Sequence, residues 1–272
     1  MIRTAMRNAL SRIPFLRPMY RRSRDFLQQK DSFRITPWGF EMAGNPTMAL
    51  GKFEPLETKQ ICRLLGEVDI LVNVGANIGY YCCHALNQKK EVIAVEPVVS
   101  NIRYLLANIK KNGWELGIKV FPVALGRSED IMSMWGDGTG ASLVKGWGGN
   151  LEQGGLLVPV HTLDGLLGGN LNSKRALILM DVEGFEYEVL LGASRALAND
   201  PRPIWFLEIT TNQHQPIDVG FNPKFVEIFK LFFDNGYCAI KVGDDEVEVS
   251  MDDVNQWANG ARTLDVHNFI FR

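Results

Sequence analysis

The sequence has few of the features that would assign it to a membrane-spanning, metal-binding or disulfide-rich class. No stretch is apolar for long enough to cross a bilayer, and no run of seven apolar residues near residue 1 suggests a signal peptide. The four cysteines show no CxxC spacing, which favours reduced core thiols and a reducing, cytosolic-type compartment. A net charge of only −2 argues against a general nucleic-acid binder.

The composition that is present suits one large folded domain. With 272 residues, 46% hydrophobic and 22% charged, the chain can bury a full core. We expect an N-terminal basic helix and cap or lid segment in residues 1–55. The main domain is then residues 56–272, interrupted by a glycine-rich insertion at 126–155.

The first 24 residues contain seven arginines and no acid. Apolar side chains recur at helical spacing over residues 2–13, which predicts a short basic amphipathic helix ending before Pro14. Three interpretations are open: a cap helix docked on the domain, which we favour; reversible contact with an anionic membrane; or a cleaved organellar presequence.

Apolar runs alternate with amphipathic segments along the rest of the chain. Runs without polar alternation are typical of parallel strands covered on both faces, and they occur at residues 69–74, 91–97, 118–125, 156–160, 176–180, 204–207, 237–242 and 267–271. Strand and helix in alternation predict right-handed crossovers and an α/β fold whose sheet is largely parallel, with about seven strands.

Residues 126–155 break this pattern because glycine is frequent and periodicity is weak. A long glycine-rich excursion inside a compact domain is usually a functional loop, and we expect a mobile insertion. Trp135 and Trp147 lie within it. They either face a substrate or anchor the insertion to the core, and the sequence favours neither.

The stretch from Asp69 to Tyr80 contains an apolar strand that leads into the turn Gly75-x-Asn77-x-Gly79. Glycine there lets the backbone approach a ligand at a helix N-terminus, and asparagine tolerates positive φ. A dinucleotide fold would place a third glycine where Tyr80 stands, and no Walker motif is present. The turn therefore suits adenosine and a charged amino-acid group, which points to S-adenosylmethionine.

Carboxylates stand at the carboxyl ends of three of the apolar runs, at Glu96, Asp181 and Glu208. The ligand crevice of an open α/β sheet lies at the carboxyl ends of its strands, so we expect these side chains to meet there. Glu96 comes about twenty residues after the glycine turn, where an acid can accept the ribose hydroxyls of an adenosine cofactor.

Five motifs resemble, in order and spacing, those of the FkbM-type S-adenosylmethionine-dependent methyltransferases. They are V-G-A-N-I-G at 74–79, V-E-P at 95–97, T-L-D at 162–164, M-D-V-E-G-F-E at 180–186 and F-L-E-I at 206–209. The resemblance implies a class I, Rossmann-like fold with a seven-stranded, mostly parallel sheet, helices on both faces and an antiparallel last strand. It also implies O-methylation of a hydroxyl, often on a sugar or polyketide-like metabolite.

The same resemblance assigns residues to the cofactor. It implies that a cofactor-binding set wraps S-adenosylmethionine and its ribose, namely Asn73, Gly75, Ala76, Asn77, Gly79, Glu96 and Asp181. Asp181 and Glu183 would border the methyl-transfer site. The chain departs from the family at Asn73, where an acid is usual, and at Met180, where a lysine is usual. Weaker cofactor binding is expected from the first change, by roughly 1 kcal/mol.

An unactivated hydroxyl must lose its proton as it attacks a sulfonium methyl, so a general base is needed. Asp181 is our first choice, Glu183 and Glu208 the second, and His161 or His214 a third. Each acid has a structural alternative: Glu183 could cap the following helix, and Glu208 could pair with an arginine. A divalent ion could also assist, but no metal-ligand motif is present and no metal site is predicted.

The sequence thus predicts an enzyme that transfers a methyl group from S-adenosylmethionine to a hydroxyl of a sugar, glycolipid or related small metabolite. We expect it to be cytoplasmic, with peripheral membrane contact through residues 1–24 as an open alternative. Two other hypotheses remain: a catalytically impaired relative that binds cofactor or glycan, and an NAD-dependent oxidoreductase, which Tyr80 disfavours. Acceptor specificity should reside in residues 126–155 and 210–222, because loops on a rigid scaffold commonly carry it.

Overall fold

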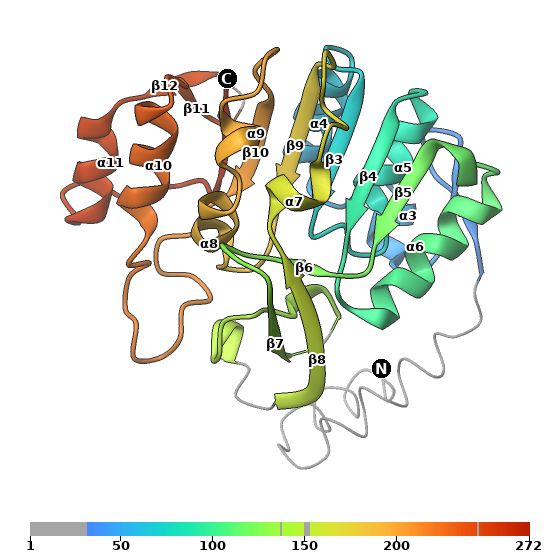
Figure 1. The fold of residues 1–272 in the computed structure, drawn as a ribbon, viewed down its shortest axis with the longest axis horizontal. Helices are drawn as coiled ribbons and strands as arrows, with labels where there is room; N and C mark the ends of the chain where they lie inside the picture. Colours follow the sequence, from blue (N-terminus) through green and yellow to red (C-terminus); the bar gives the residue numbers. More distant parts are fainter. Residues whose placement is uncertain (1–31, 137, 150–152, 244) are drawn as a thin grey trace, which may run out of the picture.

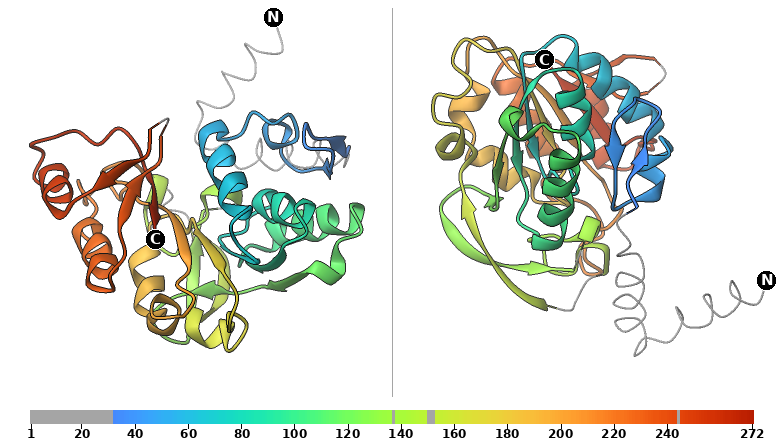
Figure 2. Two further views of the ribbon diagram at one scale, coloured as in Figure 1. Left: turned by 90° about the horizontal axis from the view of Figure 1, so that it is seen from above. Right: turned by 90° about the vertical axis from the view of Figure 1, so that its right-hand side faces the viewer.

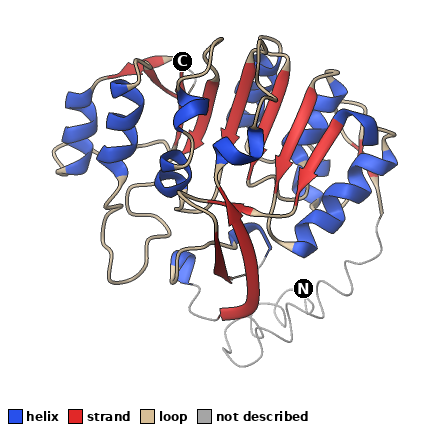
Figure 3. Ribbon diagram, in the orientation of Figure 1, coloured by secondary structure: helices blue, strands red, loops and turns tan. Residues whose placement is uncertain are grey.

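The computed structural model describes residues 32–136, 138–149, 153–243 and 245–272, and its centre is an eight-stranded sheet with helices on both faces (Figure 1, Figure 3). In spatial order the strands are β12 (Val247–Val249), β11 (Ala239–Lys241), β13 (Asn268–Phe271), β10 (Ile204–Glu208), β9 (Ala176–Met180), β3 (Ile70–Val74), β4 (Glu91–Val95) and β5 (Ile118–Phe121).

Five successive strands, from β10 across to β5, pair in parallel. Strand β13 lies between β10 and β11 and is antiparallel to both, as the resemblance implied. The sheet nevertheless has eight strands where seven were expected, because β12 adds a short antiparallel edge beside β11. Every residue of β3 and β9 is buried, which explains why both strands, apart from Asn73 in β3, are apolar without alternation.

The helices divide into two layers (Figure 2). One layer holds α4 (Pro55–Leu65), α5 (Tyr80–Asn87) and α6 (Val99–Lys111); the other holds α7 (Leu163–Leu167), α8 (Glu186–Leu191), α9 (Ser194–Leu197), α10 (Phe225–Asp234) and α11 (Met251–Ala258). Alternate side chains of β3 serve the two cores: Ile70, Val72 and Val74 face the second layer, and Leu71 faces the first. The sheet is therefore covered on both faces, and a ligand can reach it only at a strand end.

The described part of the expected cap segment is a small hairpin of β1 (Arg34–Ile35) and β2 (Glu41–Met42), followed by α3 (Pro46–Ala49). Asn108 of α6 holds it, because its side-chain amide accepts from Ala43 N at 2.8 Å and donates to Ala43 O at 3.2 Å. Phe40 and Met42 pack into the core of the first layer. The predicted basic helix at residues 2–13 lies outside the described residues.

A second sheet lies beyond the carboxyl ends of the main parallel strands (Figure 1). It consists of β6 (Ala124–Leu125), β8 (Gln153–His161) and β7 (Asp130–Trp135), in that order. The expected strand at 118–125 was wrong as a unit, since it divides at Pro122 into β5 and β6, which belong to different sheets. Proline cannot donate to a strand ladder, so the chain leaves the main sheet there.

Residues 126–155, expected as a glycine-rich insertion, contain regular structure that the sequence did not predict. They contain β7, the start of β8, and two 3₁₀ turns, η3 (Gly138–Gly140) and η4 (Trp147–Gly149), and a further 3₁₀ turn, η2 (Glu115–Gly117), precedes β5. Met134, Val158 and Val160 bury one face of the β7–β8 pair. In the described part of the chain, none of the helices combines the length and apolarity that a membrane crossing needs.

Candidate functional site

The glycine turn joins β3 to α5 and is shaped by close backbone contacts. Gly75 has φ 84°, and a Cβ placed on it would lie 1.8 Å from the carbonyl oxygen of Asp181. Only glycine therefore fits where the end of β3 passes the segment after β9. Asn77, at φ 51°, and Gly79, at φ 84°, complete the turn. The backbone is thus held open at the carboxyl end of the central strand.

Glu96, directly after β4, is 4% exposed and held by three donors. Asn77 N donates to its Oε2 at 2.7 Å, and its Oε1 accepts from Val98 N at 2.9 Å and Asn101 Nδ2 at 3.2 Å. Burial raises the pKa of the carboxyl, and these hydrogen bonds act in the opposite direction. Glu96 is consequently a fixed acceptor at the edge of the glycine turn.

Asp181 stands directly after β9 and lies near Glu183, Glu186 and Glu208. Burial among protein atoms, and then the charges of Glu208, Glu183 and Glu186, raise the pKa of Asp181 well above its usual value. Asp181 is nevertheless solvent-exposed, because it lines two cavities at the end of β9; protein atoms surround its carboxyl, but the residue opens onto the site. Among the residues that the structure describes, its carboxyl has no ion pair or hydrogen bond.

The pKa values of two neighbouring acids, Glu208 and Glu186, are also raised. Burial, followed by the charges of Glu183 and Glu186, raises the pKa of Glu208. Burial raises the pKa of Glu186 to about 7, although backbone hydrogen bonds, including Gly184 N to its Oε1 at 3.0 Å, oppose the shift. The alternative that Glu208 pairs with an arginine does not hold within the described residues.

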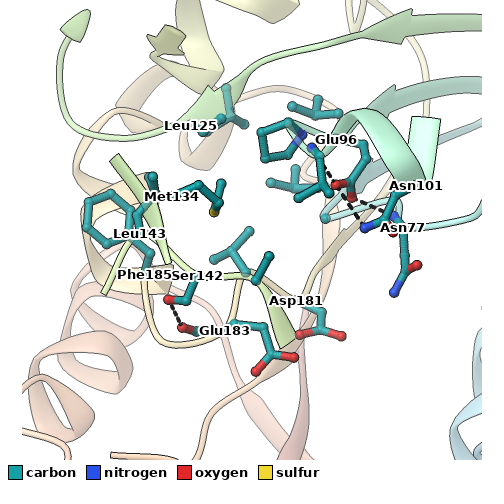
Figure 4. Close-up of a pocket in the computed structure, with 18 of the residues that line it drawn as sticks. Asn77, Glu96, Asn101, Leu125, Met134, Ser142, Leu143, Asp181, Glu183 and Phe185 are labelled. Atoms are coloured by element: carbon teal, nitrogen blue, oxygen red, sulfur yellow. Dashed lines mark hydrogen bonds between the residues drawn. The ribbon is translucent and has the colours of Figure 1, made fainter. Parts of the chain in front are cut away.

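Two cavities meet at Gly75, Asn77 and Asp181. The first, of about 600 Å³, is bounded by the glycine turn, the Glu96 region and residues 138–143; its lining includes Val95, Glu96, Val98, Asn101, Leu125, Met134, Ser142, Leu143, Glu183 and Phe185. Figure 4 shows Glu96, Asn77 and Asn101 at one side of it, and Asp181, Glu183 and Ser142 at another. Apolar walls with a few polar groups are typical of a small-molecule site.

The second cavity, of about 510 Å³, lies on the other side of the glycine turn. Its polar lining includes Asn73, Glu54, Tyr81, Asp181 and Glu208, with Met48, Phe53, Ala76, Tyr80, Met180, Phe206 and Asn268 among the remaining wall residues. Tyr81 donates its hydroxyl to Glu54 Oε2 at 2.7 Å. Asn73, 2% exposed, donates to Cys82 Sγ at 3.4 Å.

The structure brings most of the predicted site residues to these two cavities. Gly75, Asn77 and Asp181 line both, Glu96 and Glu183 line the first, and Asn73, Ala76 and Glu208 line the second. Gly79 lines neither; it begins α5 and packs against Leu105. Their roles as ligands of a cofactor or as catalytic groups stay predictions.

The weaker candidates lie elsewhere. His161 is 3.6 Å from Glu129 and lines neither cavity. Asp164 does not face the site, because its carboxyl accepts from Ser194 Oγ and from the backbone N–H groups of Arg195 and Ala196. Among the described residues, no group of three or more His, Cys, Asp or Glu side chains could hold a metal ion.

Sequence reasoning missed several residues that shape the site. Asn101 connects Glu96 to Gly138 O at 3.2 Å, and Ser142 Oγ donates to Glu183 O at 2.6 Å. Trp147, for which two roles were open, is 4% exposed and donates to Glu183 Oε2 at 2.6 Å. Glu183 therefore does not cap α8. No local pattern identifies these contacts, because each joins segments distant in sequence.

Comparison with solved structures gives low similarities, and three of the similar structures are described as methyltransferases. A methyltransferase FkbM from Methylobacillus flagellatus KT is 17% identical with a TM-score of 0.46, over 75% of this chain and 43% of that one. A precorrin-6y C5,15-methyltransferase from Geobacter metallireducens GS-15 is 12% identical with a TM-score of 0.42, over 85% and 92%. An O-methyltransferase family protein from Burkholderia thailandensis is 7% identical with a TM-score of 0.42, over 82% and 56%.

At these sequence identities and TM-scores, the structural similarities say nothing about the reaction of this chain. This chain also spans less than half the length of the Methylobacillus protein. No curated protein matches the chain.

A protein-family model gives the decisive match. The model described as "Methyltransferase FkbM domain" covers residues 73–238, from the glycine turn and Glu96 through the Asp181 to Glu186 segment and beyond Glu208. This range is 166 of the 272 residues, or 61%. The chain therefore belongs to the FkbM methyltransferase family.

Proposed function

We propose that this protein is an S-adenosylmethionine-dependent O-methyltransferase that acts on a hydroxyl of a sugar, glycolipid or related small metabolite. The observation that carries the proposal is the position of Asp181. Its carboxyl has no hydrogen-bonding partner in the described part of the chain, its pKa is raised, and it stands where the two cavities meet. Such a group is suited to take a proton between two bound molecules.

The first cavity fits the adenosine part of the cofactor. Glu96 offers a carboxylate that three donors fix in place, and such an acceptor suits a pair of ribose hydroxyls. Leu125, Met134 and Leu143 provide an apolar wall for a flat ring. The open backbone at Gly75 lets a bound molecule pass the end of β3. When bound, S-adenosylmethionine supplies an electrophilic methyl group.

The residues of this chain would then align the acceptor and remove its proton. Asp181 accepts the proton of the acceptor hydroxyl as that oxygen forms its new bond to carbon. A carboxylate with a raised pKa is a stronger base than an ordinary one. Glu183 and Glu208 lie on either side of Asp181 and are the next candidates for the same step.

The second cavity is where we place the acceptor and the amino-acid end of the cofactor. Glu54, Asp181 and Glu208 line it, and none of its described lining residues is Lys, Arg or His. Carboxylates accept hydrogen bonds from hydroxyls and repel phosphate or carboxylate groups. We therefore expect neutral polyhydroxylated acceptors to react better than their phosphorylated forms.

Calorimetry with S-adenosylmethionine and S-adenosylhomocysteine is the first test. Absence of binding at millimolar concentration would refute the proposal. A labelled-methyl screen over sugars, glycolipids and small hydroxylated compounds then tests transfer.

Binding without transfer to any acceptor would favour a second function, that of a catalytically impaired relative. Two departures from the family motivate this alternative, Asn73 and Met180.

A membrane partner is a separate proposal. The seven arginines of residues 1–24 would contact anionic lipid and keep a cytoplasmic enzyme near membrane-borne acceptors. Co-sedimentation with phosphatidylserine vesicles, with and without residues 1–24, tests it. Equal sedimentation of both forms would contradict it.

A further inference from the structure

Trp147 is a buried side chain of the glycine-rich segment, and it contacts the proposed catalytic region from outside both cavities. Its indole Nε1 donates to Glu183 Oε2 at 2.6 Å. Tryptophan has one donor and no acceptor, so this contact fits only the acceptor side of a carboxyl. An N–H bonded to a carboxylate is among the stronger hydrogen bonds of proteins.

The backbone around Glu183 is adapted to this contact. Glu183 has φ 55°, a conformation that side-chain-bearing residues adopt at a cost, and strain of this kind collects at functional sites. Gly184 has φ 92°, and a Cβ on it would lie 2.3 Å from the Trp147 ring. The E-G pair of the D-V-E-G motif therefore gives the indole the room it needs to reach the carboxylate.

The same segment holds Glu183 at a second point. Ser142 Oγ donates to the main-chain oxygen of Glu183 at 2.6 Å, and Ser142 also lines the first cavity. On the far side, Gly148 N donates to His214 O at 2.7 Å, and the His214 ring lies 6.0 Å from that of Trp147. Residues 142–148 therefore hold Glu183 at two points, through a hydrogen bond to its side chain and another to its main chain.

We propose that Trp147 is a positioning residue: it fixes the Glu183 carboxylate beside Asp181 and so sets the strength of Asp181 as the base for methyl transfer. This inference rests on the proposed function. Glu183 is one of the charges that raise the pKa of Asp181, and the effect of a charge depends on its distance. If Glu183 turned away toward solvent, Asp181 would be a weaker base with a lower pKa.

The kinetic test compares Trp147→Phe with Trp135→Phe. Both remove an indole N–H from the same segment, but Trp135 lines neither cavity, and the described contacts of its ring are with Lys145 rather than with a carboxylate. In Trp147→Phe we expect kcat to fall about tenfold, the size expected for losing one charge-assisted hydrogen bond. S-adenosylhomocysteine affinity should change less than threefold in either variant. Trp135→Phe should retain its kcat.

The pH profile separates positioning from packing. Loss of like-charge repulsion lowers the pKa of Asp181, so the acidic limb of the kcat profile should move to lower pH in Trp147→Phe. A merely structural role for Trp147 would reduce kcat at all pH values and leave that limb in place. An unmoved limb, or an unchanged kcat, would overturn the inference.

A second measurement needs neither an acceptor nor a variant of Trp147 that folds. The indole ¹⁵N–¹H signal of Trp147 in the full-length protein should lie downfield, exchange slowly and shift with pH; Glu183→Gln should remove the part of this shift due to Glu183. The wild type must be compared with Glu183→Gln because other titratable groups lie nearby and can also shift the signal. Asp181, Glu186, Glu208 and Glu54 surround Glu183, and His214 faces the indole.

The outcomes distinguish the two proposals. A fast-exchanging Trp147 signal with the same pH dependence in both proteins would overturn the positioning role by itself. A wild-type protein that transfers methyl to no acceptor would refute the proposed function, whatever the state of the Trp147 contact.

Discussion

Glu96 directly follows β4 and Asp181 directly follows β9, so both carboxylates stand at the carboxyl end of a strand of the main sheet. The surroundings of the two carboxylates nevertheless differ. Glu96 accepts from Asn77, Val98 and Asn101, so its charge is compensated by fixed donors. Asp181 has no such donor within the described residues and faces other acids. The comparison shows that position at a strand end does not decide what a carboxylate can do; the donors around it do.

This difference suggests a division of roles, in which Glu96 binds a ligand and Asp181 takes up a proton. A carboxylate held by three donors is suited to bind a ligand and keep its shape, whereas one surrounded by negative charge has a high affinity for a proton. Four expectations test the division, from the largest effect to the smallest.

Replacing Asp181 by Asn should have the largest effect on catalysis. The amide keeps the shape of the side chain but cannot accept a proton, so we expect kcat to fall by about 10²–10⁴. Binding of S-adenosylhomocysteine, measured by calorimetry, should change only a few-fold. Asp234→Asn, an exposed residue at the end of α10, is the matched control. If Asp181→Asn remains active while Glu208→Gln or Glu183→Gln is not, the base is one of those residues instead.

Replacing Glu96 by Gln should affect binding more than turnover. Glutamine has an NH₂ group in place of one carboxylate oxygen, and that group cannot accept a hydrogen bond. A buried N–H such as that of Asn77 would then have no acceptor, at a cost of about 1–3 kcal/mol. We expect cofactor affinity to fall by roughly tenfold to a hundredfold by calorimetry. Glu129→Gln changes the same charge at a residue whose side chain is 81% exposed and should bind normally. Normal binding by Glu96→Gln would remove the ribose assignment.

The acidic cluster should make stability depend on pH. The pKa of Glu186 rises from 4.5 to about 7 on folding, so the neutral form stabilises the fold fully below pH 4.5. This contribution is lost as pH rises through about 7. The thermal midpoint of the wild type should therefore fall over this interval by several degrees, since 1 kcal/mol moves it by about 2–4 °C.

Glu186→Gln should flatten that pH dependence, because its side-chain oxygen can still accept from Gly184 without carrying a charge. Glu227→Gln, an exposed residue of α10, should not. Parallel curves for the wild type and Glu186→Gln, recorded by thermal scans between pH 5 and 8, would show that Glu186 is not the group responsible.

The smallest effect is expected at Asn73. An acid there would pair with the ammonium of the cofactor, and Asn73→Asp should strengthen binding by about 1 kcal/mol, or fivefold. Asn73 is 2% exposed and contacts Cys82, so the new carboxylate must lie toward the second cavity. Weaker cofactor binding by Asn73→Asp in calorimetry would mean that the buried charge finds no cation.

Much of the site could be predicted because its signals are local. Gly75 and Asn77 are residue types that tolerate positive φ, and Glu96, Asp181 and Glu208 stand at the ends of apolar strands. Parallel strands place their carboxyl ends at one edge, so their following residues converge whatever the details of the fold.

The prediction of strands failed where the chain passes from one sheet to another, where glycines are frequent, or where a strand is very short. Pro122 sends residues 124–125 into a second sheet, and β7 lies in a segment whose glycines hide its pattern. β12 is three residues long with two exposed positions, too short for a periodic signal.

The sequence by itself determined the α/β class, the glycine turn, the carboxylates that follow the strands, and the family, because each depends on residues close together in the chain. Only the tertiary structure decided which carboxylate is compensated and which is not. Asn77 reaches Glu96 from 19 residues away, Trp147 reaches Glu183 from 36 residues away, and Glu208 and Glu54, both distant in sequence, add to the charges that raise the pKa of Asp181. Electrostatic environment is a sum over neighbours in space, and those neighbours are known only once the chain is folded.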